Sequence, residues 1–83
     1  MRLDKYLKVS RIIKRRTVAN EACGLGRVTV NGKEAKPGAQ VKEGDILTIR
    51  LGQKEIKARI TSTAEHARKE DAAAMYEILE GGE

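Results

Sequence analysis

The chain has 83 residues, of which 35% are charged, a formal net charge of +5, and neither Trp nor Phe. A chain of this length forms one small domain, whose modest core must consist of Leu, Ile, Val and Ala. No apolar run approaches the roughly 18 residues of a membrane span. The single cysteine, Cys23, excludes an internal disulfide and favours a cytoplasmic location.

The positive charge is concentrated at the start of the chain. The first sixteen residues contain seven Lys or Arg and one acid, whereas residues 61–83 contain six acids and two Lys or Arg. Such a basic segment predicts a polyanionic partner. The alternative is an ordinary solvated surface, which is the commoner role of charged side chains.

The first predicted helix spans residues 2–9. At helical spacing, cationic side chains lie on one side, and the large apolar ones share an arc: Leu3, Tyr6 and Leu7. A basic amphipathic helix can also bind a membrane, but the small core needs these apolar side chains, which argues against that role. Asp4 falls in the first turn, where we expect a structural carboxylate that holds the helix start or a neighbouring arginine.

A basic connector, residues 10–16, leads to a second helix that we expect at residues 17–24. Thr17 is the expected N-cap of this helix. The buried arc of the helix is expected to contain small and apolar side chains: Val18, Ala19, Ala22 and Cys23.

Short alternating segments between residues 27 and 60 predict three or four strands of a small twisted antiparallel sheet. The pair Asn31-Gly32 is the strongest turn signal and predicts a hairpin. Residues 46–51 and 55–60 alternate as strands do.

The C-terminal segment, residues 61–83, has two open interpretations. Ala72 to Met75 favours a helix that docks Met75, Ile78 and Leu79, whereas residues 75–79 could instead add a strand. The last three residues, Gly81 to Glu83, are expected to fray.

Cations displayed on a helix pair would bind phosphates without reading base sequence. Tyr6 and Tyr76 are the only aromatic residues, and Tyr6 is expected in the core, so stacking platforms for single strands are missing. This combination favours structured RNA, recognised by its shape and backbone. Two lysines near the predicted hairpin tip offer a second contact point: Lys33 and Lys36.

Catalysis and metal binding have little support in the sequence. His66 is the only histidine and lies in a polar stretch, and Cys23 is expected to pack in the core. No spacing of ligands suits a metal, and no nucleophile lies near a base. We therefore expect no enzyme activity, cofactor or metal.

The chain resembles the RNA-binding domain first named for ribosomal protein S4, over residues 1 to about 51. The resemblance is carried by Arg-Leu-Asp-Lys-Tyr-Leu at 2–7, Ser-Arg at 10–11, Lys-Arg-Arg-Thr-Val-Ala at 14–19 and Gly-Arg-Val-Thr-Val-Asn-Gly-Lys at 26–33. It implies an α+β fold, the αL motif, in which two helices pack on a small sheet and grip structured RNA. Arg2-Leu3-Asp4 also resembles the catalytic triplet of pseudouridine synthases, but here it lies inside the RNA-binding motif, which argues against catalysis.

The resemblance implies an RNA-binding face made of ten side chains, carried over position by position. They are Arg2, Lys5, Arg11, Lys14, Arg15, Arg16, Thr17, Asn20, Lys33 and Lys36. We expect an RNA-binding domain over residues 1–60 and an extension over residues 61–83, packed on it or trailing from it.

Stand-alone members of this family include the heat-shock protein 15 group and the bacterial ribosome-associated quality-control protein P group. The chain is most similar to the second group, which implies a monomeric factor that binds large-subunit rRNA and the tRNA of a stalled nascent chain. Such a factor would support alanine tailing by an NFACT-class partner. The alternative is an accessory subunit that targets a separate RNA-modifying enzyme, with the acidic end as its docking surface.

Overall fold

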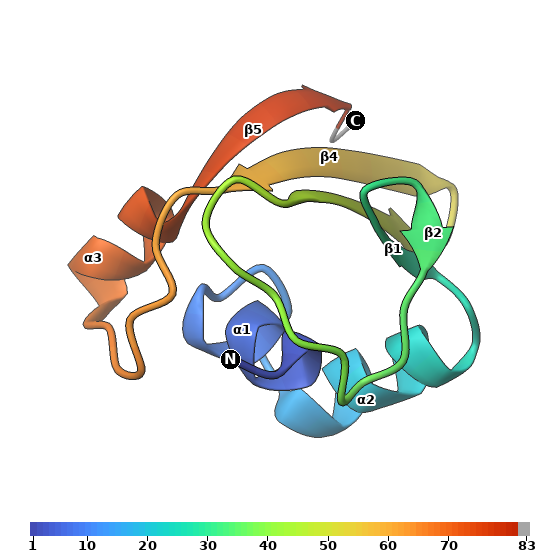
Figure 1. The fold of residues 1–83 in the computed structure, drawn as a ribbon, viewed down its shortest axis with the longest axis horizontal. Helices are drawn as coiled ribbons and strands as arrows, with labels where there is room; N and C mark the ends of the chain where they lie inside the picture. The colour runs from blue at the N-terminus through green and yellow to red at the C-terminus, as the bar shows by residue number, and fades with distance from the viewer. Residues whose placement is uncertain (82–83) are drawn as a thin grey trace.

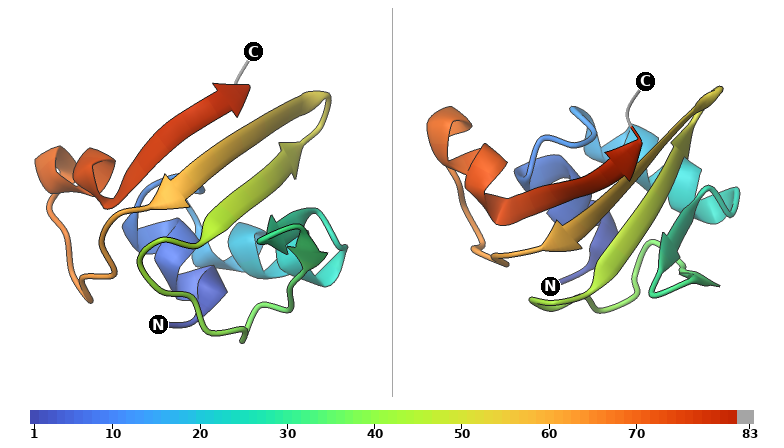
Figure 2. Two further views of the ribbon diagram at one scale, coloured as in Figure 1. Left: turned by 45° about the horizontal axis from the view of Figure 1, so that its top comes forward. Right: turned by 90° about the horizontal axis from the view of Figure 1, so that it is seen from above.

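A five-stranded antiparallel sheet carries two helices on one face and a small helical segment at one end (Figures 1 and 2). This computed structural model describes residues 1–81. Its helical elements are α1 Leu3–Val9, α2 Arg16–Gly24, α3 Lys69–Ala72 and the 3-10 turn η1 Ala73–Met75. The strands are β1 Val28–Val30, β2 Lys33–Glu34, β3 Ile46–Leu51, β4 Lys54–Ile60 and β5 Tyr76–Gly81, in the order β2-β1-β3-β4-β5.

The helix α1 buries the arc that the sequence predicts. Leu3, Tyr6 and Leu7 are fully buried and pack with Leu47 and Ile49 of the central strand β3. Because Lys8 of this helix and Arg2 at its N-cap are exposed to solvent, the helix presents an apolar side to the sheet and a basic side outward. The α+β class and the amphipathic first helix are therefore confirmed.

The helix α2 differs from its prediction in two ways. It begins at Arg16 with Arg15 at the N-cap position and no side-chain cap, so Thr17 as N-cap is wrong. Val18 is 44% exposed, so its predicted burial is also wrong. The physical reason is that only the smallest side chains allow close packing of α2 on the core. The buried residues are Ala19, Ala22 and Cys23.

The predicted hairpin is confirmed at Asn31-Gly32. Both residues have positive φ, 53° and 86°, as a type I′ turn requires, and Val30 pairs with Lys33 across it. The Asn31 side chain also accepts a hydrogen bond from the Ile46 backbone N–H at 3.0 Å, which ties the turn to the start of β3.

The C-terminal segment contains both of the structures that the sequence left open. The short helix α3 and η1 are followed by β5, which pairs with β4 and makes a fifth strand. Met75 is buried, but Ile78 and Leu79 are 51% and 41% exposed, so docking of these two side chains is wrong. The helix ends before both residues, which instead lie on β5 at the edge of the sheet. Gly81 pairs with Ile56 rather than fraying, whereas residues 82–83 lie outside the described residues.

Candidate nucleic-acid interface

A buried carboxylate, Asp4, lies between two arginine side chains, Arg2 and Arg16, and is only 2% exposed. It accepts hydrogen bonds from Arg2 Nε at 3.2 Å and from Asn20 Nδ2 at 3.4 Å. Arg16 Nε forms an ion pair with Asp4 Oδ2 at 3.5 Å. We call these four residues, Arg2, Asp4, Arg16 and Asn20, the Asp4 cluster. It joins the start of α1 to the first two turns of α2.

Backbone contacts fix the position of this cluster. The Leu3 N–H donates to the Ala39 carbonyl at 2.8 Å, and the Val41 N–H donates to the Met1 carbonyl at 2.9 Å. The first turn of α1 is therefore held against the loop that precedes β3. The Lys5 backbone N–H also donates to Asp4 Oδ1 at 2.8 Å, which orients the carboxylate within its own helix.

The electrostatics of the cluster keep Asp4 ionised. Burial alone would raise the pKa of Asp4, but hydrogen bonds from Arg2, Asn20 and Arg16 outweigh burial and hold that pKa below its ordinary value. The Arg2 and Arg16 side chains are half exposed, at 50% and 49%. Their remaining N–H groups are thus oriented by Asp4 and still accessible to an anion.

An open hollow adjoins the cluster on α2. It is lined by Asp4, Arg16, Thr17, Asn20 and Glu21, with a volume of about 440 Å³. Four of the ten predicted site residues therefore come together here: Arg2, Arg16, Thr17 and Asn20.

Lys5, a member of the predicted face, contacts the C-terminal segment. Its side chain forms an ion pair with Glu65, which belongs to the segment between β4 and α3. The hydrogen bond and the charge of Lys5 hold the pKa of the Glu65 carboxyl below its usual range. Lys5 therefore links α1 to the C-terminal segment.

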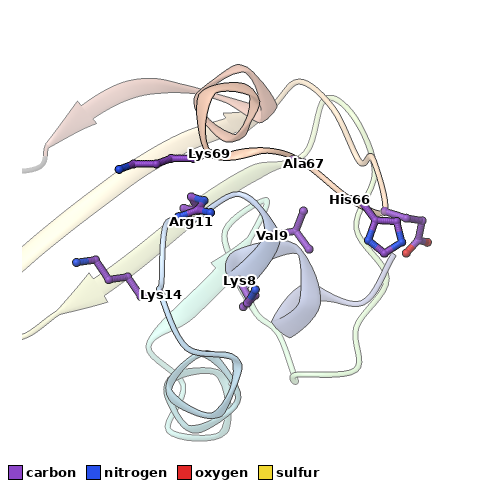
Figure 3. Close-up of a pocket in the computed structure, with 8 residues that line it drawn as sticks. Lys8, Val9, Arg11, Lys14, His66, Ala67 and Lys69 are labelled. Carbon is purple, nitrogen blue, oxygen red and sulfur yellow. The ribbon is translucent and has the colours of Figure 1, made fainter.

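A second group of cations surrounds a cleft of about 450 Å³ between the α1–α2 connector and α3 (Figure 3). Arg11 and Lys14, both predicted site residues, line one wall together with Lys8 of α1. We call this the connector cleft; its polar lining residues are Lys8, Arg11, Lys14, Glu65, His66 and Lys69. Two lining residues are absent from the predicted set: Lys8, which the sequence placed only on the cationic side of the first helix, and Lys69. Nothing in the sequence indicated that the start of α3 lies beside the connector.

The other predicted site residues are distributed more widely. Arg15 is exposed at the N-cap of α2. Lys33 and Lys36 are exposed on and after β2, at the end of the molecule opposite α3 (Figure 1). Lys36 lies beside Cys23 and Gly24 at the C-terminal end of α2, whereas the Asp4 cluster contacts the N-terminal end. The structure therefore does not bring the hairpin lysines to the cluster.

Reactive side chains are placed as the sequence predicts. Cys23 is buried, and burial raises the pKa of its thiol to about 11, so the thiol stays protonated at neutral pH. His66 is exposed.

Tyr6 is buried and donates a 2.6 Å hydrogen bond to the Met75 carbonyl, so it offers no stacking surface. Within residues 1–81, no cluster of His, Cys, Asp and Glu suits a metal ion, and no helix is long and apolar enough to cross a membrane.

Comparison with known proteins identifies similar chains over nearly the whole length. The S4 domain family matches residues 1–47. The chain is 60% identical to the "RQC P-site tRNA stabilizing factor" of Halalkalibacterium halodurans, over 94% of this chain and 89% of that protein. It is 52% identical to the protein of the same name from Bacillus subtilis, over 95% and 92%. A solved structure of heat shock protein 15 from Vibrio cholerae, described as trimeric, matches with a TM-score of 0.88 and 32% identity, over 95% of this chain and 81% of that one.

Proposed function

The chain belongs to the S4 domain family, and on that premise we propose that it is a non-enzymatic RNA-binding factor of the large ribosomal subunit. The observation that carries this proposal is the Asp4 cluster, in which one buried carboxylate orients two half-exposed guanidinium groups. Guanidinium groups held in a fixed geometry favour bidentate contacts to phosphates of a folded backbone. The names of the relatives indicate that the RNA is a tRNA in the ribosomal P site.

In more detail, we propose that the factor contacts large-subunit rRNA and the P-site tRNA of a stalled nascent chain in the cytoplasm. It would thereby support alanine tailing by an NFACT-class rescue factor. The proposed RNA contacts are the ten side chains named from the sequence, of which Lys5 also contacts Glu65. We also keep the proposed division into an RNA-binding domain, residues 1–60, and an extension, residues 61–83.

The test is co-sedimentation of Arg16→Ala with large ribosomal subunits that carry a P-site tRNA. We expect the affinity to fall about ten-fold or more, because the variant loses hydrogen bonds to charged groups in the site. The matched control is Arg50→Ala, which removes the same charge from β3, where the Arg50 side chain is 72% exposed. Equal binding by wild type and Arg16→Ala, or equal losses in both variants, would contradict the proposed face.

A second candidate function is an accessory subunit that brings a separate RNA-modifying enzyme to its RNA. The observation that favours it is the edge strand β5, where Ile78 and Leu79 are about half exposed, because exposed apolar edges pair readily with other chains. Pull-down after RNase digestion decides between the two: a modifying enzyme recovered without RNA supports the accessory role, and recovery of ribosomal particles only before digestion supports the first proposal.

A further inference from the structure

The connector cleft has two walls that come from distant parts of the chain. Figure 3 shows Lys8, Arg11 and Lys14 on the side of α1 and the connector, with His66 and Lys69 on the side of the C-terminal segment. The S4 family match ends at residue 47, so the second wall lies outside the matched region. The cleft therefore exists only because residues 65–69 fold back onto the connector.

The charge in the cleft is largely uncompensated. Four cationic side chains line it, whereas its one carboxylate, Glu65, already contacts Lys5. Among the residues that the structure describes, no carboxylate lies within 4.0 Å of the side-chain nitrogens of Lys8, Arg11, Lys14 or Lys69. Cations that line one cleft without a paired carboxylate repel one another, and a bound anion would relieve that repulsion.

The backbone of Arg11 supplies a second, independent observation. Its φ of 63° is in the left-handed region that disfavours side chains other than Gly, Asn and Asp. The connector is nevertheless held in place, because Ser10 and Ile13 are buried and the Arg11 N–H donates to the Lys8 carbonyl at 3.0 Å. A strained residue whose side chain lines a cleft is typical of a functional position.

The size of the cleft narrows the class of ligand. Its volume of about 450 Å³ lies in the range of about 300–1,000 Å³ that is usual for pockets that bind small molecules or ligand segments. Cations on both walls fit a phosphodiester chain that passes between them, with its charge distributed along the cleft. Lys5 connects the cleft to the Asp4 cluster, because its side chain contacts Glu65 and its backbone N–H donates to Asp4.

We propose that the connector cleft is a second phosphate-binding site, completed by Lys69 of the C-terminal segment, for the ribose-phosphate backbone of the RNA that the Asp4 cluster binds. This inference rests on the proposed function, because it assumes the same RNA. The proposal assigns an RNA-binding role to residues 65–69, which lie outside the region that the S4 family matches.

The experiment compares Lys69→Gln with Arg68→Gln in binding to a tRNA transcript, measured by fluorescence anisotropy. The two variants remove one charge from neighbouring positions, but only Lys69 lines the cleft. We expect Lys69→Gln to weaken binding about three-fold or more, as loss of one phosphate contact should, and Arg68→Gln to bind nearly as wild type does. Equal losses in the two variants would overturn the site in favour of general attraction by charge.

Titration with inorganic pyrophosphate distinguishes RNA backbone from a free anion. We expect amide NMR signals of residues 8–14 and 65–69 to shift in wild type and not in Lys69→Gln, and pyrophosphate to compete with tRNA. A saturable pyrophosphate site with unchanged tRNA binding by Lys69→Gln would overturn the backbone assignment.

The variants also separate this proposal from the proposed function. If Arg16→Ala loses RNA binding and Lys69→Gln does not, the proposed cleft site is wrong while the proposed function stands. If wild type binds no RNA, both proposals are wrong.

Discussion

The Asp4 cluster and the connector cleft both belong to the basic side of the molecule, but they are built in opposite ways. In the cluster, a buried carboxylate pairs with Arg2 and Arg16, so much of the positive charge is compensated and its geometry is fixed. In the cleft, Lys8, Arg11 and Lys69 surround a hollow without a paired carboxylate among the described residues. The cluster holds its arginine N–H donors in a fixed orientation, and the cleft attracts anions through its unpaired charge.

The number of cations alone does not determine how the proposed RNA-binding face would bind RNA. Attraction over long range depends on net charge and falls with salt. Recognition of shape depends instead on donors held at fixed positions, and here the donor positions depend on one acid, Asp4. An acid at the centre of a basic face can therefore strengthen binding to a polyanion.

The largest combined effect on RNA binding and on stability is expected from Asp4→Asn. This variant makes the chain more positive, yet we expect RNA binding to fall about ten-fold. Asn keeps only one acceptor oxygen and no charge, and its amide NH2 donates toward Arg2 and Arg16, so the ion pairs that orient both arginines are lost. We also expect the free energy of unfolding to fall by about 2 kcal/mol, because charge-assisted hydrogen bonds to a buried group are lost. Binding to tRNA and urea unfolding measure the two effects.

Glu55→Gln is the control for this prediction, since it removes an equally charged acid from the exposed part of β4. We expect it to leave stability and RNA binding nearly unchanged. Tighter RNA binding by Asp4→Asn than by wild type would mean that net charge dominates and that the cluster does not orient its arginines.

Two variants of Arg11 separate the contribution of its charge from that of its strained backbone. We expect Arg11→Gly and Arg11→Ala to weaken RNA binding equally, by about three- to ten-fold, because both remove the same cleft cation. The two should differ in stability, with the Gly variant more stable than the Ala variant by about 1 kcal/mol, since Gly adopts positive φ without steric cost. Thermal unfolding of both variants checks the difference; equal stability would mean that the connector relaxes.

The smallest expected effect concerns acid pH. The folded-state pKa of Asp4 is lowered, so its ionised form contributes stability above its ordinary value of 3.8, and this contribution is lost as pH falls through the folded pKa. The stability gap between wild type and Asp4→Asn should therefore be full at about pH 6 and shrink below about pH 3.8. Urea midpoints of both proteins across this range test the sign, and a gap independent of pH would exclude Asp4 as the titrating group.

Local patterns predicted the elements of the fold well. The arc of Leu3, Tyr6 and Leu7 predicted α1 and its buried side, and Asn31-Gly32 predicted the hairpin, because both depend on spacing within a few residues. The predicted N-cap of α2, Thr17, was wrong because the start of this helix depends on a contact that is distant in the sequence. The start of that helix coincides with a contact between Arg16 and Asp4, and nothing local to residues 15–17 indicates that contact.

The candidate site was predicted only as a set of residues. The sequence identified Arg2, Arg16 and Asn20, but it could not show that Asp4 brings these three together, because the contacts depend on how α1 packs on α2. Lys69 was missed because it lies more than fifty residues along the chain from the connector. Which of these side chains contact RNA stays a prediction.

The most direct test of the contrast between the two sites is the salt dependence of tRNA binding by wild type, Asp4→Asn and Arg11→Ala. Loss of a phosphate contact lowers the slope of log affinity against log salt by about one, whereas loss of orientation lowers affinity at every salt concentration. We predict a lower slope for Arg11→Ala, and for Asp4→Asn a lower affinity with the wild-type slope. Parallel behaviour of the two variants would contradict the division into an orienting cluster and an attracting cleft.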